Sequence, residues 1–160
     1  MVLIKIIAAI GKNNELGKNN NLIWHFKEDL KFFKEETTGH KIVMGYNTFI
    51  SLPKMLPNRT HIILTHHTID NKDVITFSNF EDLLKYLKTL NETIFIIGGS
   101  SLYKLFLEIA DEIVLTEIND TKDADVYFPK FDKKKYHKEI MDEHKENDIS
   151  YKHVRYRRIK

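Results

Sequence analysis

The sequence has no cysteine, which excludes disulfide bonds and thiolate metal sites. No apolar run reaches the roughly 20 residues that a helix needs to cross a bilayer, so we expect no membrane partner. Basic and acidic residues nearly balance, at 25 and 23, and this balance gives no reason to expect a nucleic-acid partner. The missing cysteine fits the reducing conditions of the cytoplasm, where we expect the protein to act.

What is present suits a folded core. Hydrophobic residues make up 42% of the chain and aromatic residues 11%, which is more apolar material than a disordered chain carries. A length of 160 residues suits one domain, and we expect residues 1–160 to form it.

The order of apolar segments predicts an α/β fold. Short, almost continuous apolar runs are typical of strands that are buried on both faces of a parallel sheet. Such strands are expected at residues 2–10, 41–45, 60–65, 73–77, 93–97 and 112–118. Helices are expected at residues 26–38, at 46–52, after Ser78 or Asn79, and from Ser100. Segments 135–144 and 149–159 predict an antiparallel hairpin, with a bulge or an edge where the apolar phase slips in the last strand.

The expected helix 26–38 carries one unusual side chain. Phe26, Asp29, Leu30 and Phe33 follow the i, i+3, i+4, i+7 spacing of one helix face, so Asp29 lies in an apolar stripe. A carboxylate facing a core is costly unless it is paired or hydrogen-bonded, and such groups concentrate at functional sites. From this segment alone, a helix-start acid at the rim of the core is the simpler interpretation.

Two strand-to-helix junctions contain glycine. Gly45 follows one expected strand and Gly98-Gly99 follows another, and glycine lets a backbone approach a ligand closely. A helix N-terminus favours anions, so two such junctions together could hold the two phosphates of a dinucleotide. Residues 11–21, rich in glycine and asparagine, predict a long loop of the kind that covers a binding site.

The histidines and the basic C-terminus have simpler explanations than a site. His66 and His67 are adjacent, so on a strand they would point to opposite faces, and no ligand spacing surrounds them. We therefore expect no metal, although His66 could contact a phosphate. The basic residues from Lys152 to Lys160 are expected on a solvated edge strand rather than at a nucleic-acid interface.

An ordered set of motifs makes the chain resemble the monomeric dihydrofolate reductases of bacteria over nearly its whole length. The set comprises Ile7-Ala8-Ala9, Leu16-Gly17, Leu22-Ile23-Trp24, Asp29, Met44-Gly45-x-x-Thr48, Leu56-Pro57-x-Arg59, Ile97-Gly98-Gly99, Leu115-Thr116 and Asp125-x-x-Phe128-Pro129. The resemblance implies an eight-stranded, mainly parallel sheet with four helices, and reduction of dihydrofolate to tetrahydrofolate with NADPH. It also implies a monomer.

The resemblance implies roles for individual residues. Asp29 would pair with the pterin and favour its protonated form, Trp24 would orient a water, and Thr116 would hydrogen-bond to the Asp29 site. Arg59 would bind the glutamate carboxylate of the substrate, a task that suits a guanidinium. The substrate pocket would be lined by Ile7, Leu30, Phe33, Leu52, Leu56, Ile97 and Tyr103.

The same resemblance implies a cofactor site and a cis peptide between the two glycines. The implied cofactor residues are Ala9, Leu16, Gly17, Leu22, Gly45, Tyr46, Asn47, Thr48, Leu64, Thr65, His66, Gly98, Gly99, Ser100, Ser101 and Leu102. The family often has arginine where Tyr46 stands and a basic residue where Ser101 stands, so we expect a weaker preference for NADPH over NADH. The family also often has proline where Lys27 stands.

Two other functions compete with this interpretation. A reductase of the related riboflavin-pathway type would share the fold and NADPH, but Asp29 and Arg59 suit a pterin with a glutamate tail. A non-catalytic nucleotide-binding module would have no reason to bury the acid at position 29.

Overall fold

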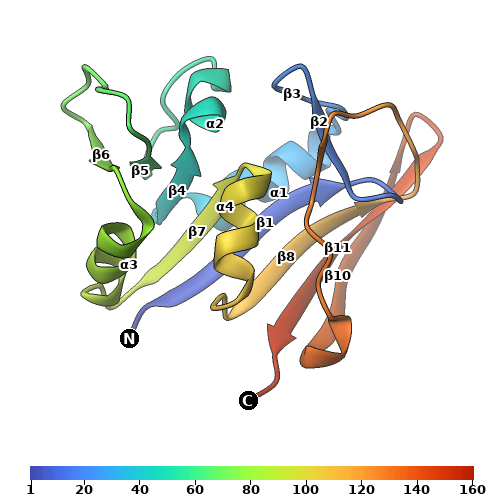
Figure 1. The fold of residues 1–160 in the computed structure, drawn as a ribbon. Helices are drawn as coiled ribbons and strands as arrows, with labels where there is room; N and C mark the ends of the chain where they lie inside the picture. The colour runs from blue at the N-terminus through green and yellow to red at the C-terminus, as the bar shows by residue number, and fades with distance from the viewer.

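A large twisted sheet forms the centre of the protein (Figure 1). The computed structural model describes residues 1–160. The strands follow the order β10-β11-β8-β1-β7-β4-β5-β6 across the sheet. Their bounds are β1 Leu3–Ile10, β4 Lys41–Gly45, β5 Thr60–Leu64, β6 Val74–Phe77, β7 Thr93–Gly98, β8 Glu112–Ile118, β10 Tyr136–Glu146 and β11 Ile149–Arg158.

Strand directions agree with the sequence pattern. The pairs from β8 through β1, β7, β4 and β5 to β6 are parallel, whereas β11 pairs antiparallel with both β8 and β10. Four α-helices accompany the sheet: α1 Lys27–Thr37, α2 Tyr46–Ser51, α3 Phe80–Lys88 and α4 Ser100–Leu107. A 3-10 turn, η1 Lys133–Lys135, precedes β10. The expected eight-stranded α/β fold with an antiparallel C-terminal hairpin is confirmed.

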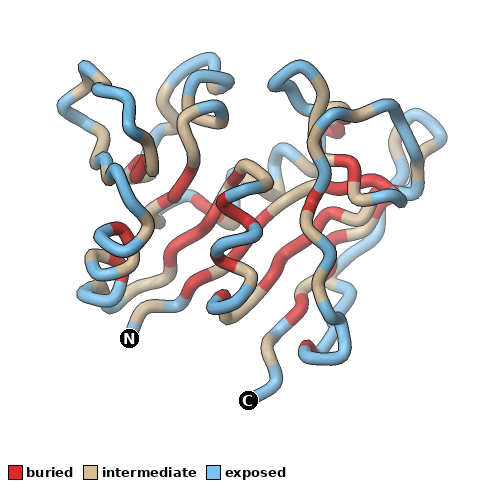
Figure 2. Tube along the Cα trace, in the orientation of Figure 1, coloured by how far each residue is buried: buried red, intermediate tan, exposed pale blue.

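Helices cover both faces of the sheet, which explains why its central strands are apolar at successive positions. Leu83 and Leu87 of α3 and Phe106 of α4 belong to the main core on one face. Phe32 and Phe33 of α1 pack against a second cluster on the opposite face, which contains Ile7. Figure 2 shows the buried residues concentrated along these central strands. No helix is long and apolar enough to cross a membrane.

Residues 11–21 do not form one continuous loop, so that prediction is wrong for part of the segment. Two short strands, β2 Glu15–Lys18 and β3 Asn21–Leu22, join β9 Val126–Tyr127 in a small second sheet. The fully buried Glu15 carboxylate accepts backbone N–H bonds from Asn13 and Lys122. The pairing of β2 with β9 and the bond from Lys122 to Glu15 both join residues more than 100 positions apart, and local composition does not reveal them.

The C-terminal hairpin contains the expected irregularity on the other strand. The register of β10 against β11 shifts between Ile140 and Asp142, which places a bulge in β10 rather than in the last strand. A bulge adds one residue to one strand, and it therefore changes which side chains stand opposite each other. As a result, Asp142 rather than Met141 is the partner of His153.

Candidate active site

Helix α1 places Asp29 against the C-terminal part of β8. The Thr116 hydroxyl donates to Asp29 Oδ1 at 2.5 Å, as the family resemblance implies. The Asp29 side chain keeps 16% of its exposure, so it lies at the rim of the core and faces a partly open space. The expected stripe is wrong at one position: Leu30 is 48% exposed. Phe32, which that stripe does not include, packs on the sheet instead. The reason is that α1 contacts β11, where the Phe32 ring stacks on His153.

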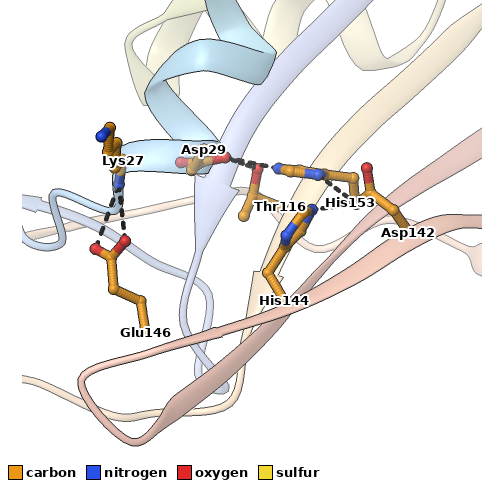
Figure 3. A network of polar contacts seen from close by, with 7 residues as sticks. All are labelled: Lys27, Asp29, Thr116, Asp142, His144, Glu146 and His153. Atoms are coloured by element: carbon orange, nitrogen blue, oxygen red, sulfur yellow. Dashed lines mark hydrogen bonds and ion pairs between the residues drawn. The ribbon is translucent and has the colours of Figure 1, made fainter.

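His153 is the main site residue that the sequence analysis missed. Its ring is fully buried on β11, with Nε2 at 3.0 Å from Asp29 Oδ1 and Nδ1 at 2.6 Å from Asp142 Oδ1. Figure 3 shows these side chains in a line from α1 to β10, with His144 beside Asp142. The only available signal was a polar residue in phase with the buried Tyr151, because the histidine's partners depend on strand register.

The distance between the His153 ring and Asp142 is that of a hydrogen bond rather than that of two ligands on one metal ion. Asp142, His144 and His153 bring three ligand atoms within 4.8 Å of one another. Two ligand atoms on one tetrahedral zinc, each at about 2.0 Å, stand roughly 3.3 Å apart. The 2.6 Å between Nδ1 of His153 and Oδ1 of Asp142 is a short, charge-assisted hydrogen bond.

Trp24 lies beside the site, but its indole N–H already has an acceptor. It donates to Asp120 Oδ2 at 3.0 Å, and this hydrogen bond holds the pKa of Asp120 below its ordinary value. The ring packs with Phe26, Ile118 and Tyr151 in a small buried cluster. The water expected at this N–H would require the bond to Asp120 to open.

The apolar residues expected to line a substrate pocket largely gather in one place. Ile7 lies in the second core cluster, and four others from the expected pocket pack against it: Phe33, Leu52, Leu56 and Ile97. Tyr103 is buried in the main core, and its hydroxyl donates to the Ile7 carbonyl at 2.8 Å. That bond anchors β1 behind the pocket, and burial raises the pKa of Tyr103.

Arg59 follows Leu56 of this wall in the chain and has no acidic partner. Its guanidinium donates to the Pro57 carbonyl at 3.0 Å and to Thr37 Oγ1 at 3.1 Å, and it forms no ion pair. Partial burial lowers its pKa. A guanidinium held in place by neutral acceptors retains its charge for an anionic ligand.

His61 fixes the segment that carries Leu56 and Arg59. The fully buried ring accepts the Leu56 N–H at Nε2, at 3.1 Å, and faces the Arg59 carbonyl with Nδ1, also at 3.1 Å. These partners require a neutral ring with its proton on Nδ1. Burial lowers the pKa of His61, which agrees with the neutral form.

The two glycine junctions lie next to each other. Gly45 precedes α2 and Gly99 precedes α4, and a Cβ on Gly45 would be 4.0 Å from both the Gly98 carbonyl and the Gly99 nitrogen. The Gly98–Gly99 peptide is cis, as the resemblance implies. Thr48 Oγ1 would be 3.1 Å from a Cβ on Gly98, so the hydroxyl stands directly beside the junction.

Other expected cofactor residues surround these junctions at different depths. Tyr46 stacks on His67 with ring centroids 3.9 Å apart, while Thr65 Oγ1 accepts the His67 backbone N–H. The Asn20 side chain donates to the Asn47 carbonyl at 3.1 Å, linking the β2–β3 turn to α2. The remaining expected residues are Leu64 at the end of β5, the exposed His66, Ser100 and Ser101 at the start of α4, Gly17 and Leu22 paired between β2 and β3, Ala9 packed near Trp24, Leu16 packed on the main core and Leu102 inside it.

Comparison with known proteins decides the family. A sequence model described as "Dihydrofolate reductase" matches residues 3–158. The chain belongs to the dihydrofolate reductase family. The resemblance inferred from the ordered motifs is therefore confirmed, and this reading is supported over a riboflavin-pathway reductase or a nucleotide-binding module.

Individual dihydrofolate reductases match over most of their length. The enzyme of Haemophilus influenzae is 36% identical over 143 residues, covering 89% of this chain and 88% of its own. That of Bacillus subtilis is 37% identical over 131 residues, covering 81% and 77%. A dihydrofolate reductase from Enterococcus faecalis, solved with NADP(H) and RAB-propyl, is 29% identical and superposes with a TM-score of 0.88 over 99% of this chain and 97% of its own.

Proposed function

We propose that the protein reduces 7,8-dihydrofolate to 5,6,7,8-tetrahydrofolate, with NADPH as its cofactor. The observation that carries the proposal is the position of Asp29, a half-enclosed carboxylate fixed by Thr116 at the end of the apolar wall formed around Ile7. The reduction needs a proton at pterin N5 as well as a hydride at C6. NADPH supplies the hydride from its nicotinamide C4.

Asp29 supplies the charge that makes the pterin easier to protonate. Dihydropterin N5 is a weak base, and a fixed carboxylate stabilises the cation that forms when N5 gains its proton. The Thr116 hydroxyl donates to Oδ1 and so holds the carboxylate in one orientation. Asp29 therefore acts as the anchor of the pterin ring and biases its protonation, and water completes the proton transfer to N5.

Arg59 recognises the opposite end of the substrate. The apolar wall from Ile7 to Leu56 suits the pterin and benzoyl rings, and the guanidinium of Arg59, which follows Leu56 in the chain, has no acidic partner. Arginine pairs with carboxylates through two parallel hydrogen bonds, which suits the glutamate of dihydrofolate. His61 keeps Leu56 and Arg59 in this arrangement through its two backbone contacts.

The glycine junctions fit the pyrophosphate of NADPH. Gly45 presents no side chain toward Gly98-Gly99, and a methyl group at position 45 would take space that we expect the pyrophosphate to use. Thr48 and Ser100 add hydroxyl donors at the starts of α2 and α4. The stacked pair of Tyr46 and His67, together with His66, would contact the 2′-phosphate of NADPH in place of an arginine.

We expect the small sheet of β2, β3 and β9 to cover the cofactor side of the site. Its β2–β3 turn reaches α2 through the Asn20–Asn47 hydrogen bond. A closed covering segment keeps water away from hydride transfer and protects the reduced product. We further propose that residues 1–160 work as one domain and a monomer in the cytoplasm, without a nucleic-acid or membrane partner.

One assay tests the proposal. Absorbance at the NADPH band should fall when the purified protein meets dihydrofolate, and it should not fall when dihydrofolate is omitted. Replacing dihydrofolate with a ribosylated aminopyrimidine tests the riboflavin-pathway alternative. Oxidation of NADPH with that compound, and none with dihydrofolate, would refute the proposed function.

A further inference from the structure

His153 joins two carboxylates that lie on different elements. Its ring has no solvent exposure and stacks on Phe32, with ring centroids 3.8 Å apart and planes at 9°. One ring nitrogen faces Asp29 of α1 at 3.0 Å and the other faces Asp142 of β10 at 2.6 Å (Figure 3). Asp142 is 43% exposed, so a continuous hydrogen-bonded chain runs from solvent to the carboxylate of the active site.

Strand register builds this chain. Thr116 of β8 and His153 of β11 are cross-strand partners, and so are His153 and Asp142 of β10. The three side chains therefore form a row across the sheet beneath α1. Without the β10 bulge, Met141 would stand opposite His153, because Val154 pairs with Ile140. The bulge thus supplies the outer carboxylate.

The chemistry of the row favours an imidazolium. A neutral imidazole has one N–H, so one of its two nitrogens would direct a lone pair at a carboxylate. The cation can donate to both. Burial lowers the pKa of His153, but the hydrogen bonds that the ring donates to Asp29 and Asp142 outweigh burial, so the pKa lies above its ordinary value. The other titratable groups that face the ring are His144 of β10 and Tyr151 of β11, while β8 contributes only the hydroxyl of Thr116.

Both bonds to Asp29 end on the same oxygen. Thr116 and His153 each contact Oδ1, and Oδ2 receives no hydrogen bond from the protein. The carboxylate is therefore held from one side, with its second oxygen left for a ligand. A cation at 3.0 Å also offsets part of the negative charge that this oxygen presents.

We propose that His153 is a positioning residue for Asp29, and that the triad Asp29–His153–Asp142 fixes the carboxylate and sets the pH range of the reduction. The proposal rests on the proposed role of Asp29. Removing the imidazolium leaves the site more negative, and a more negative site retains protons to higher pH. The alkaline decline of kcat/KM should therefore move to higher pH when His153 loses its charge.

Activity profiles provide the first test. His153→Phe keeps an aromatic ring on Phe32, and we expect kcat/KM for dihydrofolate to fall about tenfold, the effect of one charge-assisted hydrogen bond. Its alkaline decline should move up by about one pH unit. Asp142→Asn, at a half-exposed position where packing is undisturbed, should favour the neutral form of the His153 ring beside Asp29 and so move the decline in the same direction by less. His137→Gln changes an exposed histidine of the same strand and should leave the profile unchanged.

Nuclear magnetic resonance provides a readout that does not depend on turnover. The ring nitrogens of His153 should titrate above the ordinary histidine pKa of 6.5 in the substrate-free protein, and Asp142→Asn should lower that titration. A His153 that titrates at or below 6.5, or a pH profile that is unmoved in both variants, would overturn the triad. If His153 of the unchanged protein titrates as expected but the Asp29→Asn variant keeps full activity, the proposed role of Asp29 is overturned instead.

Discussion

The indole N–H of Trp24 donates to the carboxylate of Asp120, at 3.0 Å, and ties the segment before α1 to the end of β8. Trp24 is the only tryptophan, so fluorescence excited selectively at tryptophan reports on this one ring. Asp120→Leu removes the acceptor, and acrylamide should then quench the emission more strongly because the ring loses its anchor. Asp120→Asn retains an acceptor oxygen and should behave like the unchanged protein. Equal quenching in all three proteins would contradict this anchoring role.

Asp29→Asn tests the central carboxylate. The amide cannot stabilise a protonated pterin, so kcat/KM at neutral pH should fall by roughly a hundredfold or more. The loss should shrink in acid, where free dihydrofolate protonates unaided. Glu28→Gln, which changes the neighbouring exposed acid of the first turn, is the matched control and should keep its activity. A wild-type rate for Asp29→Asn at neutral pH would disprove the mechanism.

Arg59→Gln tests recognition of the glutamate end. Loss of a charged hydrogen-bonding partner should raise KM for dihydrofolate by about tenfold to a hundredfold, with little change in KM for NADPH. Dihydropteroate lacks the glutamate, so the variant and the unchanged protein should use it equally well. If the variant is impaired equally with dihydropteroate, Arg59 acts through the fold rather than through the substrate carboxylate.

Gly45→Ala tests the junctions as a phosphate site. The added methyl group would meet the backbone of Gly98 and Gly99 only at 4.0 Å, an ordinary contact, so the melting temperature should hold. The same methyl occupies the space assigned to the pyrophosphate, and KM for NADPH should rise while KM for dihydrofolate changes little. Unchanged affinity for NADPH would place the pyrophosphate elsewhere.

The protonation of His61 should make stability depend on pH. Its pKa in the folded protein is lowered by burial, so the unfolded chain binds this proton more readily. The stabilisation from His61 is therefore fully present above the ordinary value of 6.5 and is lost as pH falls toward the lowered value. Urea unfolding of the protein and of His61→Gln should show a stability difference that shrinks from pH 7 to pH 5. A difference that grows over that interval would show a charged ring.

Sequence patterns predicted the parts of the protein that local chemistry determines. The runs at residues 2–10 and 93–97 are apolar and end beside glycine, which predicts buried strands, and β1 and β7 form there. Gly45 and Gly98-Gly99 could be linked because parallel strands end at the same edge of a sheet. Asp29 interrupts an apolar stripe of α1, and this local pattern is visible in the sequence.

The features that were missed depend on pairing between distant segments. Glu15 is buried because Lys122, more than 100 residues later, donates to it. His153 meets Asp142 because of a one-residue bulge that the sequence pattern placed on the wrong strand.

The proline that often occupies position 27 in the family has no N–H. Lys27 has one and donates it to Glu146 at 3.3 Å, and this contact joins α1 to the hairpin turn.

The Asn20–Asn47 hydrogen bond has a consequence for how the cofactor enters and leaves. It is exposed, and the turn that carries it is otherwise tied to residues 123–125 rather than to α2. One such bond contributes about 1 kcal/mol, so it favours the closed arrangement by less than about tenfold. Breaking this one bond therefore costs little, and the tip of the β2–β3 turn can separate from α2 while β2 stays paired with β3 and β9.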